Sequence, residues 1–149
     1  MTAPIALEPH EGHTPSAFGT TYRLLATAAD TGGSYSLIEI ALQPGGFGPA
    51  PHVHREEDES FYVLEGELDL RVGDVSVRGT PGAFVFVPRG TAHSFANVGS
   101  TIGRLLAAHL PALDGFFTDL AQLAEGAAQP DKDAISAVMA TWGMDVVGP

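Results

Sequence analysis

Short extended segments separated by frequent turns constrain the fold of this chain most strongly. Glycine- and proline-rich turns such as Gln43-Pro-Gly-Gly46, Thr80-Pro-Gly82 and Pro88-Arg-Gly90 interrupt the chain at short intervals. Many short strands with such turns are typical of a sandwich or barrel of antiparallel strands. We therefore predict an all-β domain, with strands near residues 22–28, 34–42, 59–64, 67–72, 75–78, 83–87, 93–97 and 102–110.

The two ends of the chain have different sequence patterns from this central region. Residues 1–20 are rich in Pro, Gly, Thr and His without periodicity, which predicts an N-terminal arm. Residues 21–110 form the β-domain. Within residues 111–149 the apolar period changes to that of a helix, which predicts two short helices packed on the barrel. The first carries the stripe Leu113, Phe116, Phe117, Leu120 and Leu123 and stops at Gly126; the second is capped by Asp131 and ends before Gly143.

Two strands are apolar on both faces, which bears on assembly. The segments 61–64 and 83–87 contain almost only large apolar residues, whereas segment 67–72 alternates between apolar and polar residues. Such strands need cover on both sides, either from a second sheet or from another subunit. We predict a homodimer in which the partner caps one sheet and the arm before Tyr22 is exchanged between subunits.

Composition narrows the possible partners and ligands. The 149 residues suffice for one domain, and 44% hydrophobic against 17% charged residues is typical of a folded protein. A formal net charge of −11 disfavours nucleic acid and anionic membrane surfaces as partners. The first ten residues do not resemble a secretory signal, so we expect a cytoplasmic location. Since cysteine is absent, any metal ion must be held by His and carboxylate side chains.

Four residues combine metal-ligand chemistry with a suitable spacing. His52 and His54 are two apart, so on an extended strand both side chains point to the same face. Glu59 follows at the start of the next apolar run, and His93 begins a later one. We therefore predict that His52, His54, Glu59 and His93 hold one divalent ion per chain. Binding should weaken below about pH 6, because imidazole must be neutral to bind a metal and free His titrates near ~6.5.

Two segments carry the resemblance to a known family. The pattern G-x5-H-x-H-x4-E-x6-G is met at Gly46, His52, His54, Glu59 and Gly66, and the pattern G-x5-P-x-G-x2-H-x3-N at Gly82, Pro88, Gly90, His93 and Asn97. In both motifs the chain resembles the cupin superfamily, in particular its small single-domain microbial members, over about residues 35–110. The resemblance implies a jelly-roll antiparallel β-barrel whose metal is bound by the four predicted ligands.

The predicted ligands narrow the choice of metal ion, and the apolar residues near them narrow the class of substrate. Three imidazoles and a carboxylate suit Fe(II), Mn(II), Ni(II), Co(II) or Zn(II), and we favour Fe(II). Four ligands already complete the tetrahedron that zinc prefers, whereas an octahedral ion would keep two positions open. The large apolar residues near the motifs predict a mainly apolar pocket for a ring-bearing or enolic small molecule, with strand register deciding which of them face inward. They are Phe47, Phe61, Val63, Phe84, Phe86 and Phe95.

Other polar residues of these segments are interpreted as structural. We expect Glu56, Glu57 and Asp58 to be solvated, and Asn97 to close a turn or the barrel. His109 lies in an apolar run, where a packed or interface histidine is expected rather than a ligand.

Three functions are compatible with this sequence. The segments 59–66 and 87–93 look like small bacterial cupins that are compared with flavonol (quercetin) dioxygenases, which implies a metal-dependent dioxygenase in which Glu59 is both ligand and proton acceptor. The second is a non-redox isomerase, lyase or polyketide-type cyclase in which the metal polarises a carbonyl. The third is a small-molecule-binding protein without turnover, because fold and ligands alone do not imply catalysis.

Overall fold

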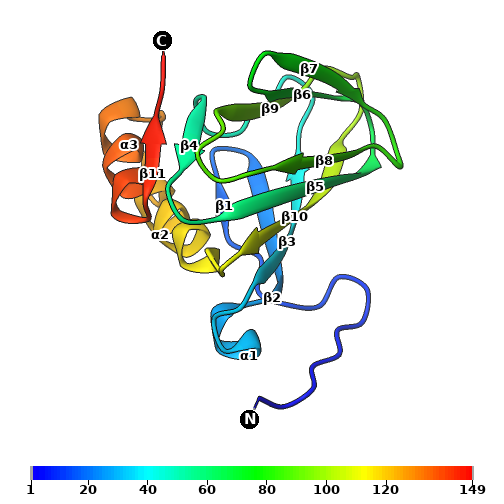
Figure 1. Cartoon of the computed structure of the whole chain (residues 1–149), viewed down its shortest axis with the longest axis vertical. Coiled ribbons are helices and arrows are strands. Elements are labelled where there is room, and N and C mark those ends of the chain that lie inside the picture. The colour runs from blue at the N-terminus through cyan, green and yellow to red at the C-terminus, as the bar shows by residue number, and fades with distance from the viewer. Residues whose placement is uncertain (1, 149) are drawn as a thin grey trace.

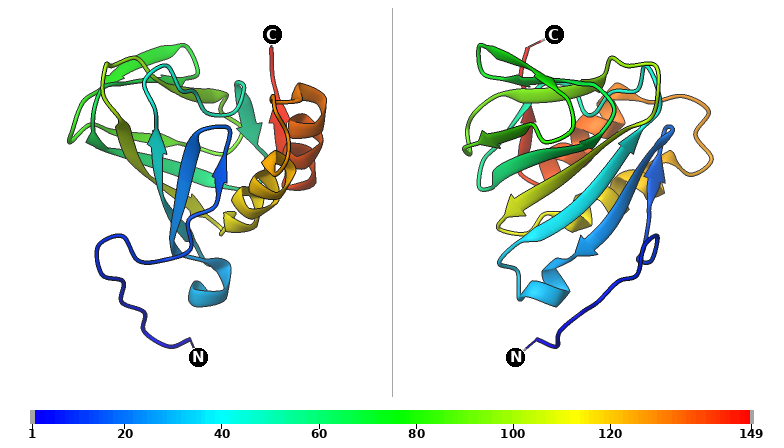
Figure 2. Two further views of the ribbon diagram at one scale, coloured as in Figure 1. Left: turned by 180° about the vertical axis from the view of Figure 1, so that it is seen from behind. Right: turned by 90° about the vertical axis from the view of Figure 1, so that its right-hand side faces the viewer.

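The computed structural model describes residues 2–148 and consists of two antiparallel sheets with the C-terminal helices at one side (Figure 1). The first sheet has six strands in the order β1-β2-β3-β10-β5-β8, and the second has five in the order β11-β4-β9-β6-β7. Figure 2 shows the two layers from behind and from the side. The strand bounds are β1 Ser16–Ala17, β2 Thr20–Ala26, β3 Ser36–Leu42, β4 His52–His54, β5 Asp58–Glu65, β6 Leu68–Val72, β7 Val75–Gly79, β8 Phe84–Val87, β9 His93–Asn97, β10 Gly103–Leu110 and β11 Met144–Val146.

The strands predicted from the turn signals are all present, and the fold class is confirmed. Their bounds shift by at most a few residues, as is usual at strand ends. Strands distant in sequence become neighbours: β10 pairs with β3 on one side and with β5 on the other. Among the described residues the two sheets do not join into one closed barrel, so the jelly roll has the form of two stacked sheets.

The core lies between the sheets and follows strand alternation. Phe61 and Val63 of β5 and Leu105 and Ala107 of β10 are buried, and these neighbouring strands place them on the same inner face. Asn97 closes the end of this core as predicted, because its amide donates hydrogen bonds to the carbonyl groups of Leu42 and Thr101.

The C-terminal helices cover one end of the stacked sheets. Helix α2 (Asp114–Ala124) buries Phe116, Phe117 and Leu120 against the strands. Helix α3 (Lys132–Thr141) begins as predicted, with the Asp131 carboxylate accepting from the backbone of the first turn. The chain then forms β11, which the helical pattern did not predict, and β11 pairs with β4.

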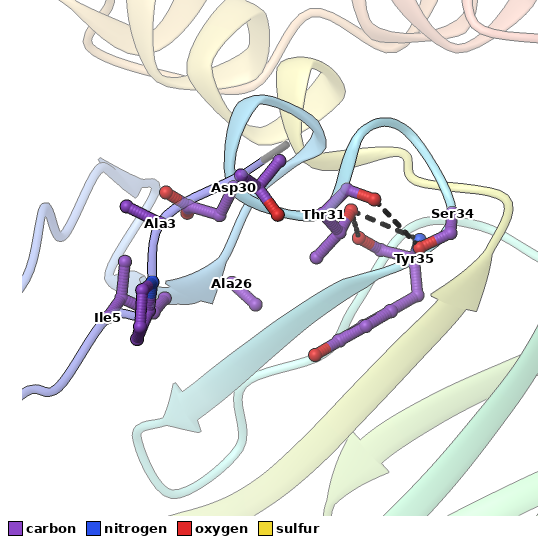
Figure 3. A pocket seen from close by; sticks show the side chains of 9 residues that line it. Ala3, Ile5, Ala26, Asp30, Thr31, Ser34 and Tyr35 are labelled. Atoms are coloured by element: carbon purple, nitrogen blue, oxygen red, sulfur yellow. Dashed lines mark hydrogen bonds between the residues drawn. The ribbon is translucent and has the colours of Figure 1, made fainter.

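The N-terminal region is only partly independent of the β-domain. Residues 2–14 are exposed, but the His13 carbonyl accepts a hydrogen bond from Leu24, and β1 pairs with β2. The first residues run past helix α1 (Ala28–Thr31) and enclose an open surface cavity of about 350 Å³ beside Tyr35 (Figure 3). The side chains of this cavity offer no cluster of His and carboxylate groups, so its lining does not suggest a metal site.

Candidate metal centre

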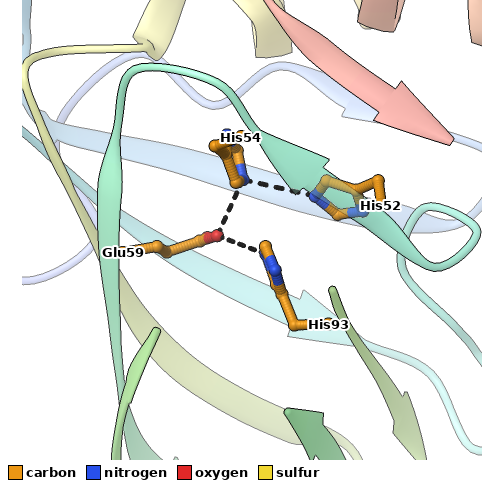
Figure 4. Close-up of side chains that lie close together, drawn as sticks. All are labelled: His52, His54, Glu59 and His93. Atoms are coloured by element: carbon orange, nitrogen blue, oxygen red, sulfur yellow. Dashed lines mark hydrogen bonds and ion pairs between the residues drawn. The ribbon is translucent and has the colours of Figure 1, made fainter. Parts of the chain in front are cut away.

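Three strands bring the four predicted ligands together (Figure 4). His52 and His54 point from β4 to one buried face, while Val53 points away. His93 on β9 is the register partner of His52, and Glu59 approaches from β5 in the facing sheet. Each of the four offers a ligand atom, and these atoms all lie within 4.8 Å of one another. The spacing in the sequence thus predicted the cluster, although the residues come from both sheets.

Hydrogen bonds to the backbone orient two of the imidazoles. Nδ1 of His52 lies 2.9 Å from the Ala50 carbonyl oxygen, and Nδ1 of His93 lies 3.0 Å from that of Thr91. A carbonyl oxygen can only accept, so each Nδ1 carries the hydrogen and donates it. This arrangement leaves Nε2 of each ring facing the cluster, and Nε2 is then the atom that each ring would offer to a metal.

The Glu59 carboxylate joins the cluster through one oxygen. Its Oε2 lies 2.9 Å from Nε2 of His54 and 2.7 Å from Nε2 of His93. Its other oxygen, Oε1, lies 2.8 Å from Nε2 of His109. Three imidazole Nε2 atoms and one carboxylate oxygen therefore converge, and this borderline-to-hard donor set suits a divalent transition metal.

Burial and the charges within the cluster shift its pKa values in opposite directions. Burial, supported by the neighbouring imidazoles, lowers the pKa of His52 to about 3. Burial also disfavours imidazolium at His54, but contacts with Glu57 and Glu59 outweigh it and raise the pKa of His54 to about 9. Burial disfavours the charged Glu59 carboxylate, yet His109, His54 and His93 hold its pKa well below the usual range. The Glu59 carboxylate is therefore ionised in the folded protein near neutral pH.

The expectation that Glu57 is solvated is wrong. Glu57 is only 7% exposed, and its Oε2 lies 3.5 Å from Nδ1 of His54. That distance is longer than a well-formed hydrogen bond, and within residues 2–148 neither atom has another hydrogen-bond partner. The turn between β4 and β5 directs Glu57 inward, while Asp58 pairs with Arg89 at the surface and Glu56 stays exposed. Glu57 is thus placed to accept from His54 in the way that carboxylates orient metal-binding imidazoles.

His109 is packed, as expected, but it also contacts the candidate site. The alternation along β10 buries Leu105, Ala107 and His109 on the inner face. The same period of two is visible in the sequence, so strand parity could have placed His109 beside the cluster. What the sequence does not contain is the register that sets His109 opposite Glu59.

The cavity beside the four ligands differs from the predicted pocket. Of the six predicted residues only Phe95 lines it, while Phe61 and Val63 are buried in the neighbouring core. The prediction is wrong for Phe47, Phe84 and Phe86, which are 72%, 61% and 53% exposed. On β8 the inner positions are taken by the alternate residues, so both phenylalanines of that strand face outward. The further apolar lining residues come mainly from β2, β3 and the C-terminal region: Tyr22, Ile40, Leu113, Phe116, Phe117 and Met144.

This cavity is small, and two aromatic residues of helix α2 form part of its lining. Its volume is about 20 Å³, which is on the order of a single water molecule. The rings of Phe116 and Phe117 are packed against each other at 5.1 Å between centroids, and Phe117 also packs against Tyr22 at 4.8 Å. A ring-bearing ligand can therefore fit beside the cluster only if side chains that line the cavity move.

Comparisons with known proteins identify the family. Residues 38–109 match the family model described as a cupin domain, and this range includes all four clustered residues. The chain contains a cupin domain. Both sequence motifs and the buried cluster lie within the matched range, and the structure has two stacked antiparallel sheets. These findings confirm the resemblance seen in the sequence.

The relatives of this cupin have diverse names. Quercetin 2,3-dioxygenase of Bacillus subtilis (strain 168) is 28% identical over 124 residues, which cover 83% of this chain and 36% of that protein. The structure of the polyketide cyclase RemF from Streptomyces resistomycificus is 28% identical with a TM-score of 0.62, covering 72% of this chain and 80% of that one. A sugar phosphate isomerase from Silicibacter pomeroyi is 26% identical with a TM-score of 0.55, covering 64% and 61%. The chain spans about a third to three fifths of the length of the curated relatives it matches.

Proposed function

We propose that this cupin is a metal-dependent dioxygenase that acts on an enolic or aromatic small molecule, with one divalent transition metal, Fe(II) favoured, held by His52, His54, Glu59 and His93. The observation that carries the proposal is the buried convergence of three imidazole Nε2 atoms and one carboxylate oxygen. Similarity to a quercetin dioxygenase over most of this chain favours oxygen chemistry. Within the described part of the chain, no helix is long and apolar enough to span a membrane. We also propose a small-molecule partner and a cytoplasmic location.

The chain's own residues have distinct roles in this proposal. A bound ion would supply Lewis acidity and a binding position for a substrate oxygen. Glu59 contributes the negative charge of the ligand set and is ionised, so it is the group placed to accept a proton from a substrate hydroxyl. Phe95, Phe116 and Phe117 provide apolar surface that favours a ring and excludes water.

A non-redox reaction, of isomerase, lyase or polyketide-cyclase type, is the second candidate, and a specific observation favours it. The polyketide cyclase RemF is 28% identical to this chain, the same identity as the dioxygenase relative, and its structure also matches this one with a TM-score of 0.62. The same donor set can polarise a carbonyl and stabilise an enolate without a change in oxidation state. Binding of a small molecule without turnover is the third reading of the same pocket.

Oxygen consumption separates these functions. The purified full chain, loaded in turn with Fe(II), Mn(II), Ni(II) or Co(II), would be mixed with a flavonol or another enolic aromatic probe in an oxygen-electrode cell. Substrate-dependent oxygen uptake that stops in the His93→Ala variant supports the dioxygenase. Product formation under anaerobic conditions contradicts it and supports the non-redox enzyme, and saturable probe binding without any product supports the binding protein.

Metal affinity should rise with pH over a wider range than the sequence predicted. The pKa of His54 is raised to about 9, so a proton competes with the metal for this residue at neutral pH. Displacement of one proton makes the apparent affinity increase by about tenfold per pH unit from about pH 6 towards pH 9. Titration of the full chain with Co(II) at pH 6, 7 and 8 measures this slope. Equal affinities at the three pH values would contradict it.

The proton on His54 also contributes to the stability of the metal-free protein, and this contribution changes with pH in a defined direction. The pKa of His54 is raised from its unfolded value of ~6.5 to about 9. Protonated His54 therefore stabilises the folded state fully below about pH 6.5, and this stabilisation is lost as the pH rises through about 9. Chelator-treated protein should therefore lose stability between pH 6.5 and 9, as followed by thermal unfolding, whereas metal-loaded protein should lose less.

We also propose that the chain forms a homodimer. The outer faces of β5 and β8 expose Tyr62, Leu64, Phe84 and Phe86, so the two doubly apolar strands are covered on only one side in a single chain. Sedimentation at micromolar concentration should give twice the chain mass of 15.5 kDa, and a Phe84→Asp variant should shift towards monomer. A single species of chain mass that does not change with concentration would exclude the dimer.

The N-terminal arm is the part proposed to exchange between subunits. Residues 2–7 are exposed and include the apolar side chains of Ile5 and Leu7. If they pack on a partner, deletion of residues 2–7 should weaken the dimer and lower its melting temperature. An unchanged mass and melting temperature would leave the arm without a role in assembly.

A further inference from the structure

His109 lies outside the four predicted ligands but touches the one carboxylate among them. It is the register partner of Glu59 across the β10–β5 pair, and its Nε2 is 2.8 Å from Glu59 Oε1. Both residues are almost fully buried. An ionised carboxylate can only accept, so His109 Nε2 carries the hydrogen and donates it.

The two oxygens of Glu59 are thereby assigned to different partners. Oε2 faces Nε2 of His54 and His93, which are ligand atoms of the cluster. Oε1 faces His109, which among the described residues is not part of the group whose ligand atoms lie within 4.8 Å. His109 therefore contacts the carboxylate oxygen that does not face His54 and His93.

The His109 ring is itself held in place by two neighbours. Its centroid is 5.7 Å from that of His54 on β4 and 5.7 Å from that of Phe117 on α2. Its backbone is paired on both sides, with Ser36 of β3 and with Glu59 of β5. The position of the His109 donor is thus fixed by its two neighbouring strands, by the His54 ring on β4 and by the Phe117 ring on α2.

We propose that His109 is a positioning residue that makes Glu59 a one-oxygen ligand, with Oε2 directed to the metal and Oε1 held by His109. The inference rests on the metal centre of the proposed function and is independent of which reaction takes place there. A carboxylate bound through both oxygens would occupy two positions of an octahedral ion. Bound through Oε2 alone, it leaves two positions open beside the three imidazoles, enough for a substrate oxygen and a second small ligand.

Two substitutions separate hydrogen bonding from packing. His109→Phe keeps a buried ring but removes the donor, so Oε1 is left unpaired. His109→Gln places an amide donor near the position of Nε2. The readouts are the Co(II) dissociation constant and the visible spectrum of the Co(II)-loaded full chain, which reports coordination number. His13→Gln, at an exposed position of the arm, is the matched control.

We expect His109→Phe to weaken Co(II) binding by about 10- to 100-fold, the usual cost of losing a partner of a metal ligand, and to change the spectrum. His109→Gln should retain affinity within a few-fold and keep the wild-type spectrum. Unchanged affinity and spectrum in His109→Phe overturn the inference, as does an equal loss in His109→Gln, which would indicate packing alone.

A second measurement decides the matter if His109→Phe does not fold. In a crystal structure of the Co(II)-loaded wild-type chain, Glu59 should bind the ion through Oε2 with Oε1 on His109, and Oε1 within bonding distance of the ion would overturn the inference. Wild-type protein that binds no metal would refute the metal centre and the inference together. Wild-type protein that binds metal as tightly as His109→Phe would refute the inference alone.

Discussion

Replacement of His93 by Ala is expected to reduce the metal affinity of the full chain by more than roughly 100-fold, because loss of even an indirect partner of a ligand costs about 10–100-fold. His93 Nε2 is one of the converging atoms, and its ring is fixed by the Thr91 carbonyl. His52→Ala should have the same effect. Elemental analysis after dialysis against a metal buffer measures the occupancy, and circular dichroism shows whether the sheets remain.

The control for this prediction is a histidine of the same chain that lies away from the cluster. His13 is exposed on the N-terminal arm, so His13→Ala should bind metal as the wild type does. Full occupancy in either His93→Ala or His52→Ala would mean that the ligands have been assigned wrongly.

A large loss of stability is expected from Gly66→Ala. Gly66, in the turn between β5 and β6, has a φ of +82°, and a Cβ there would lie 2.6 Å from the Ile102 carbonyl oxygen and 2.9 Å from the Gly103 Cα. The left-handed backbone costs an L-residue about 1–2 kcal/mol, and a clash with backbone atoms that cannot rotate away adds about 1–3 kcal/mol. Since native proteins are stable by only ~5–15 kcal/mol, this loss of roughly 2–5 kcal/mol is a large part of the total.

Gly90→Ala separates the two contributions. Gly90 has nearly the same φ, +81°, but a Cβ there would meet no atom within 4 Å. It should therefore lose only the backbone part, about 1–2 kcal/mol. Urea denaturation of both variants measures the difference in the free energy of unfolding. Equal losses would show that the close approach at Ile102 does not matter.

Most of the ligand set could be predicted from the sequence because the relevant spacing is local. A period of two places His52 and His54 on one strand face whatever surrounds them, and the motif positions of Glu59 and His93 place these residues at the starts of strands. Turn chemistry similarly marked the strand limits, and the 3.6-residue period of residues 113–123 predicted α2.

Strand register and the position of helix α2 could not be predicted from the sequence, because they depend on residues far apart in the chain. Whether Phe84 and Phe86 face inward depends on how β8 pairs with β5, and one residue of shift exchanges the two faces. The nature of the cavity depends on α2, which brings Phe117 to within ring contact of Tyr22 and His109.

The division between sequence and structure is clearest at Glu59. The sequence alone determined that a carboxylate belongs beside three imidazoles, because the two motifs carry those residue types at fixed spacings. Only the tertiary structure decided which oxygen faces them, because the second oxygen is held by His109, fifty residues further along the chain, through the register of β10 against β5. Local periodicity sets the face on which a side chain lies, whereas its partner is set by the packing of the whole domain.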